Sequence, residues 1–96
     1  MPEQRPTRYT IEFAPHASRE FKKLPKAIRA DIDAVIKALA ENPRPYGYRK
    51  LHGWNDKYRV RVGNYRVVYE IHDGILVVLI FSVGDRADIY RRMKNS

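Results

Sequence analysis

The stretch YRVRVGNYRVVYEI, Tyr58–Ile71, predicts a β-hairpin and with it much of the fold. Two segments rich in valine and tyrosine flank Gly63-Asn64, which is typical of a two-residue hairpin turn. The cross-strand pairs are then Val62 with Tyr65, Arg61 with Arg66, Val60 with Val67, and Arg59 with Val68. Because side chains alternate along a strand, one face collects the apolar residues Tyr58, Val60, Val62, Tyr65, Val67, Tyr69 and Ile71. A slip of one residue would turn arginines into the core, which favours this register.

The opposite face of the hairpin carries three arginines, Arg59, Arg61 and Arg66. Like charges directly opposite each other across a hairpin are destabilising, and Glu70 at one end of this face would relieve only part of the repulsion. Guanidinium groups match phosphate oxygens through paired hydrogen bonds. We therefore interpret this face as an anion-binding site, with three solvated surface arginines as the alternative.

The chain around the hairpin predicts an α+β fold with the order β-α-α-β-β-β and a last helix or tail over Ala87–Lys94. Alternation predicts a strand over Thr7–Phe13, and Pro15 and Pro25 each suit the first turn of a helix. The second helix carries an apolar stripe of Ile28, Ile32, Val35, Ile36 and Leu39. We expect a twisted, antiparallel-rich sheet with both N-terminal helices packed on one face.

A second two-residue turn is predicted at Asp73-Gly74, and residues 44–57 are expected to form a loop. This turn would pair Glu70 with Val77 and Arg66 with Phe81. The last strand is apolar on both faces, so we expect the C-terminal segment, a partner peptide or a base stacked on Phe81 to cover it.

Composition indicates a basic protein of 96 residues with net charge +8 and pI about 10.0. A single domain over residues 1–96 is expected, with a flexible tail at 1–6. Residues 44–72 hold seven basic and two acidic side chains, so the positive charge is concentrated as in a binding site for a polyanion.

Several classes of protein and site are excluded by what the sequence lacks. There is no cysteine, which excludes disulfides and thiolate metal sites, and no histidine or carboxylate spacing predicts a metal or cofactor. The N-terminus does not resemble a signal peptide, and the apolar run Ile75–Phe81 is too short to span a bilayer. We therefore expect a cytoplasmic protein without a membrane partner.

Three segments together resemble the RelE/ParE toxin superfamily, on its RelE side, from Tyr9 to about Arg92. They are LPKAIRADIDAVIKAL, KLHGWNDKYRVRVGNYRVVYEI and VLIFSVGDRADIY. The resemblance implies a RelE-like fold and a toxin of a type II toxin–antitoxin module. RelE-type members enter the ribosomal A site and cleave mRNA without a metal ion, by attack of the ribose 2′-OH on the adjacent phosphate. It also implies a RelB-like antitoxin as partner, and contact with operator DNA only through the antitoxin complex.

The same resemblance implies roles for individual residues. The expected catalytic residues are Arg61, Arg66, Arg86 and Tyr90. The expected RNA-binding residues are Arg49, Lys50, Lys57, Arg59 and Phe81, and His52 is a candidate acid or base. Three departures leave the proton-transfer roles open. Arg59 and Arg61 stand where the best-studied type has lysines, and Asp85 stands where many relatives have histidine. The spacing from Arg86 to Tyr90 is also shorter than in some members. The alternatives are a ParE-like inhibitor of DNA gyrase and a non-catalytic RNA-binding module.

Overall fold

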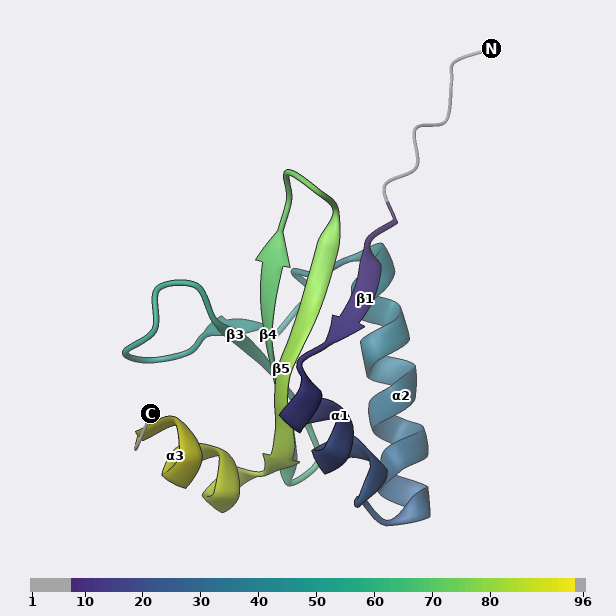
Figure 1. The fold of residues 1–96 in the computed structure, drawn as a ribbon, viewed down its shortest axis with the longest axis vertical. Coiled ribbons are helices and arrows are strands. Elements are labelled where there is room, and N and C mark those ends of the chain that lie inside the picture. The colour runs from purple at the N-terminus through teal and green to yellow at the C-terminus, as the bar shows by residue number, and fades with distance from the viewer. Residues whose placement is uncertain (1–7, 95–96) are drawn as a thin grey trace.

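The computed structural model describes residues 8–94 and shows a five-stranded sheet with helices on both of its faces (Figure 1). Its elements are β1 (Thr10–Phe13), α1 (Pro15–Lys22), α2 (Lys26–Glu41), β2 (Arg49–Lys50), β3 (Tyr58–Val62), β4 (Tyr65–His72), β5 (Val77–Asp85) and α3 (Arg86–Lys94). The strand order is β1-β5-β4-β3-β2, with β1 parallel to β5 and the other neighbours antiparallel. The predicted α+β class is confirmed, whereas the tail predicted at residues 1–6 lies outside the described residues.

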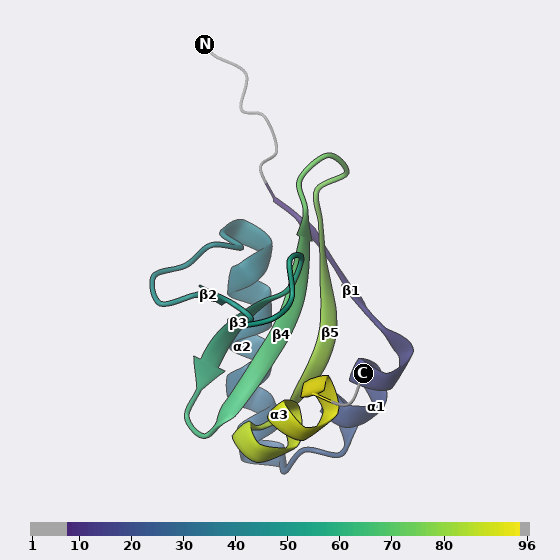
Figure 2. The same ribbon diagram turned by 90° about the vertical axis from the view of Figure 1, so that its left-hand side faces the viewer.

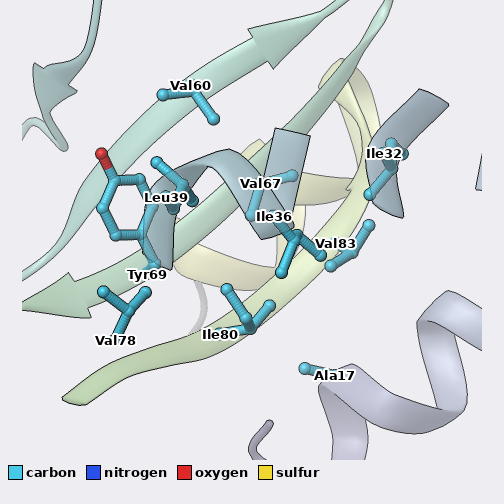
Figure 3. Packing of buried hydrophobic residues seen from close by; sticks show 10 residues of the cluster. All are labelled: Ala17, Ile32, Ile36, Leu39, Val60, Val67, Tyr69, Val78, Ile80 and Val83. Carbon is cyan, nitrogen blue, oxygen red and sulfur yellow. The ribbon is translucent and has the colours of Figure 1, made fainter. Parts of the chain in front are cut away.

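The main core lies between the sheet and the helices α1 and α2, which cover one face as predicted (Figure 1). Pro15 stands at the start of α1, and Pro25 directly precedes α2, where the missing proline N–H removes no helical hydrogen bond. The apolar stripe of α2 is buried at Ile32, Ile36 and Leu39. Figure 3 shows these side chains among strand residues of the same core, including Val67, Tyr69, Ile80 and Val83.

A second, smaller hydrophobic cluster lies on the opposite face of the sheet, where α3 packs (Figure 2). Its buried members are Leu51, Val68, Ile89 and Met93, with Trp54 and Phe81 packed against them. The C-terminal segment therefore supplies the cover that the apolar last strand was expected to need. Within residues 8–94, no helix is both long and apolar enough to cross a membrane.

The register of the first hairpin is confirmed, including the pair Arg61 with Arg66. The expectation of a loop throughout residues 44–57 is wrong, because Arg49 and Lys50 form β2 and pair with β3. Two residues are too few for an alternating pattern, so the sequence gives no strand signal there.

The register predicted for the second hairpin is also wrong. Four residues, Asp73–Leu76, separate the strands; Glu70 pairs with Leu79, and a register shift beside Val68 pairs Arg66 with Gly84. Tertiary contacts hold the longer loop: the Tyr9 hydroxyl donates to Asp73 at 2.6 Å, and the Thr10 N–H donates to the Leu76 carbonyl at 2.8 Å. These contacts override the local preference of Asp-Gly for a two-residue turn.

Asp73 should make the stability of the fold depend on pH. Hydrogen bonds from Arg44 and then from Tyr9 lower the pKa of Asp73 from 3.8 to about 2. A carboxylate with a lowered pKa stabilises the fold above its unfolded-state pKa and loses that contribution as the pH falls through the folded-state pKa. We expect the difference in free energy of unfolding between wild type and Asp73→Asn to be constant above about pH 5, to shrink as the pH falls, and to be mostly lost near about pH 2.

Urea unfolding at several pH values measures this difference. Asp31→Asn, an exposed carboxylate on α2, is the matched control and should differ little from wild type throughout. A difference between wild type and Asp73→Asn that persists undiminished at the lowest pH would contradict the assignment.

Candidate functional site

Five arginines gather on the sheet face opposite the main core, and we call Arg49, Arg59, Arg61, Arg66 and Arg86 the arginine cluster. Two cross-strand pairs build it: Arg49 pairs with Arg59, and Arg61 pairs with Arg66. Arg86 begins α3, and its N–H donates to the Asn64 carbonyl at 3.0 Å, which ties this helix to the hairpin turn. None of the ion pairs found among residues 8–94 involves a member of the arginine cluster. No carboxylate of the described residues therefore forms an ion pair with these cations.

Arg66 is the buried member of the arginine cluster, with only 3% of its surface exposed. Its Nη1 atom is buried without a hydrogen-bond partner, and the Tyr90 ring lies 5.5 Å from its Cζ atom. Burial, and then the positive charge of Arg59, lower the pKa of Arg66. A buried guanidinium without a carboxylate partner is costly unless an anion binds to it.

Two cavities are each lined by three arginines of the cluster. The smaller has a volume of about 90 Å³ and is lined by Arg61, Gly63, Asn64, Arg66 and Arg86. The other, of about 340 Å³, is lined by Tyr46, Gly47, Arg49, Arg59, Val60 and Arg61. Gly63 adopts a left-handed φ of 61° in the turn, as this type of turn requires. The smaller cavity, with three arginines around it, is suited to a single phosphate group.

The sequence did not predict that Gly63 and Asn64 line this cavity. The only available signal was the hairpin register, which places the turn directly beside the pair Arg61 with Arg66.

Lys57 and Phe81, two of the expected RNA-binding residues, contact each other beside the second hydrophobic cluster. Only 5% of Lys57 is exposed, and its ammonium lies 5.3 Å from the Trp54 ring centroid and 4.5 Å from that of Phe81. It pairs with Glu70 and, at 3.2 Å, with Asp56. These contacts direct Lys57 and Phe81 into the second hydrophobic cluster. They also occupy Glu70, which was expected to relieve the arginines.

The remaining predicted site residues converge on a third cavity, of about 500 Å³. Its lining comprises Lys50, Leu51, His52, Trp54, Arg59, Ile89, Tyr90 and Met93. Tyr90 is 52% exposed and His52 is exposed, so both residues lie at the surface, in a cavity that Arg59 of the arginine cluster also lines. Among residues 8–94, no group of three or more His, Cys, Asp and Glu side chains is placed to hold a metal ion.

Comparisons with known proteins give the class of this fold and site. Residues 11–90 match the family model of the ParE toxin of the type II toxin–antitoxin system. The chain is 34% identical to toxin RelG of Mycobacterium tuberculosis, covering 88% of this chain and 98% of that protein. It is 31% identical to the mRNA interferase toxin RelE of Escherichia coli K12, covering 85% and 90% respectively.

Among solved structures, the intact Escherichia coli RelBE toxin–antitoxin complex aligns with a TM-score of 0.72 at 32% identity, covering 80% of this chain and 95% of the matched chain. The protein therefore belongs to the ParE toxin family of type II toxin–antitoxin systems. Its similarity to these relatives and solved structures identifies it as a RelE-type toxin.

Proposed function

We propose that the protein is an endoribonuclease that cleaves mRNA in the ribosomal A site and so arrests translation. The single observation that carries the proposal is the buried Arg66 guanidinium, whose Nη1 atom has no hydrogen-bond partner, within a cluster of arginines. RNA offers a phosphate for this site and a 2′-hydroxyl as an internal nucleophile. A relative at 31% identity is named an mRNA interferase, which supports the same reading.

In the proposed reaction, Arg61, Arg66 and Arg86 surround the scissile phosphate in the 90 Å³ cavity. The 2′-oxygen attacks the phosphorus, the bond to the 5′-oxygen breaks, and a 2′,3′-cyclic phosphate and a 5′-hydroxyl result. Charge grows on the phosphate oxygens as the new bond forms. A fixed donor aimed at such charge typically contributes about 3–4 kcal/mol to transition-state stabilisation. The arginines supply the positive charge themselves, so we propose that cleavage needs no metal ion.

Tyr90 and His52 are the proposed proton-transfer groups. The Tyr90 ring lies over the Arg66 guanidinium, and this contact supports the proposal that the Tyr90 hydroxyl orients the 2′-OH or accepts its proton. His52 lines the cavity that Tyr90 also lines, and imidazole suits protonation of the leaving 5′-oxygen. Arg59 and Arg49, which line the neighbouring 340 Å³ cavity, would hold an adjacent phosphate.

Dependence on the ribosome tests this function. Tyr90 and His52 are open to solvent, and no hydrogen bond joins them within residues 8–94, so alignment of the 2′-OH should come from ribosome-bound mRNA. We expect strong cleavage of mRNA in programmed ribosomes and little cleavage of the same RNA when free, measured by primer extension. Efficient cutting of the free RNA at equal concentration would overturn ribosome dependence, and intact mRNA in both assays would overturn the endoribonuclease.

We also propose a RelB-like antitoxin as the partner that neutralises the toxin, because a solved structural neighbour is a RelBE toxin–antitoxin complex. An acidic segment of the antitoxin would complement the arginine cluster and exclude RNA from it. Contact with operator DNA would then come from the antitoxin within the complex.

A further inference from the structure

We propose that the 500 Å³ cavity beside the arginine cluster is a pocket for one nucleobase, and that it favours bases with keto oxygens, guanine and uracil. We call this cavity the base pocket. The inference rests on the proposed function, because it takes RNA to be the ligand of the arginine cluster.

The walls of the base pocket have the chemistry that a base requires. Leu51, Ile89 and Met93 are buried apolar residues that line it. Trp54 from the loop before β3 and Tyr90 from α3 add aromatic rings to the lining. Unpaired RNA bases are commonly held by stacking on such side chains.

The base pocket adjoins the arginine cluster. Arg59 lines both the base pocket and the 340 Å³ cavity of the arginine cluster. Tyr90 lines the base pocket, and its ring also lies 5.5 Å from the Cζ atom of Arg66. A nucleotide whose phosphate is bound by the arginines therefore has an apolar, aromatic cavity within reach of its base.

The polar lining gives the base pocket its selectivity. Lys50 and Arg59 carry only hydrogen-bond donors. Guanine presents O6 and N7 as acceptors and uracil presents O4, whereas adenine and cytosine place an amino donor at the corresponding edge. His52 can donate or accept and so does not discriminate. The donors Lys50 and Arg59 should therefore favour keto bases.

An apolar side chain of the antitoxin is the competing occupant of the base pocket. The continuity with the arginine cluster and the cationic lining favour a nucleotide, because an apolar side chain would leave the Lys50 and Arg59 donors without a partner. The experiment below separates the two occupants.

Trp54 is the only tryptophan in the chain, so its fluorescence reports on the base pocket without any cleavage. We would titrate the protein at low salt with GMP, UMP, AMP, CMP and ribose 5-phosphate. GMP and UMP should quench Trp54 and bind at least about fivefold more tightly than AMP and CMP, as expected for one well-placed base contact. Ribose 5-phosphate should compete for the phosphate site without comparable quenching.

Two variants with equal loss of charge test the selectivity. Lys50→Gln introduces an acceptor and leaves only the Arg59 donor, so it should lower the keto-to-amino ratio of affinities. Lys22→Gln, an exposed lysine on α1, should leave that ratio unchanged. A ratio retained in Lys50→Gln would contradict the assignment of Lys50.

The outcomes also separate this inference from the proposed function. Equal affinities for all four nucleotides, or quenching no greater than with ribose 5-phosphate, would reject the base pocket and leave the phosphate site standing. Quenching by a RelB-like peptide but by no nucleotide would assign the cavity to the antitoxin and overturn the proposal. If the proposed function is wrong, mRNA on programmed ribosomes will stay uncut, regardless of the nucleotide affinities measured by Trp54 fluorescence.

Discussion

Replacing Arg66 with methionine should abolish most of the proposed mRNA cleavage activity and leave the fold at least as stable as the wild type. The guanidinium is buried, has an unpartnered Nη1 atom and lies beside other arginines. Its removal takes away a donor aimed at the phosphate, so cleavage on programmed ribosomes should fall about 100- to 1,000-fold. Methionine fills similar space without the desolvated charge, so the free energy of unfolding should be unchanged or higher by about 1 kcal/mol.

The opposite signs of these two effects separate a functional Arg66 from a structural one. Arg19→Met changes an exposed arginine on α1 and controls for the loss of one positive charge; it should alter neither quantity appreciably. Single-turnover cleavage and urea unfolding measure the two effects. An Arg66→Met protein that is clearly less stable, or that still cleaves at the wild-type rate, would show that Arg66 serves the fold and not the reaction.

Glu70→Ala should produce a large loss of stability. Lys57 is 5% exposed and lies between two aromatic rings with Glu70 as a partner. Burial alone would lower the pKa of Lys57, but hydrogen bonds with Glu70 and then Asp56 outweigh it, so the pKa is raised. Removing Glu70 strands a buried ammonium that keeps only Asp56 and the rings, so the free energy of unfolding should fall by about 3 kcal/mol.

A double variant tests whether the stranded charge causes this loss. Lys57→Met/Glu70→Leu removes both charges and should lie within about 1 kcal/mol of the wild type. Glu41→Ala, which breaks the exposed pair with Arg8 at 3.5 Å, should change stability by less than about 1 kcal/mol. Urea unfolding of the set gives all the values, and a double variant as unstable as Glu70→Ala would contradict the account.

The first hairpin was predictable because three local signals agreed: the Gly63-Asn64 turn, the alternation of side chains and the arginines that a slip would bury. The second hairpin was not, because Asp73 and Leu76 are bonded to residues near the start of the chain, at Tyr9 and Thr10. Contacts between segments so distant in sequence leave no local pattern, and they overrode the Asp73-Gly74 turn signal.

In the candidate site, too, local sequence signals predicted some residue positions, and tertiary packing determined the others. The hairpin register alone brings Arg61 beside Arg66, and family motifs add Arg86 and Tyr90. The inward direction of Lys57 depends on Trp54, Phe81 and the position of α3, which are set by tertiary packing. The sequence shows that Lys57 lies in a basic stretch, but its pairing with Glu70 depends on tertiary packing and could not be predicted.

The ends of the RNA fragments test the central claim most directly. Wild-type toxin would be added to ribosomes programmed with a defined mRNA, and the termini of the products would be identified by mass spectrometry. Attack by the 2′-OH within the arginine cluster predicts a 2′,3′-cyclic phosphate, or its opened phosphate, on the upstream fragment and a 5′-hydroxyl on the downstream fragment. A 5′-phosphate on the downstream fragment, or mRNA that remains intact, would contradict the account.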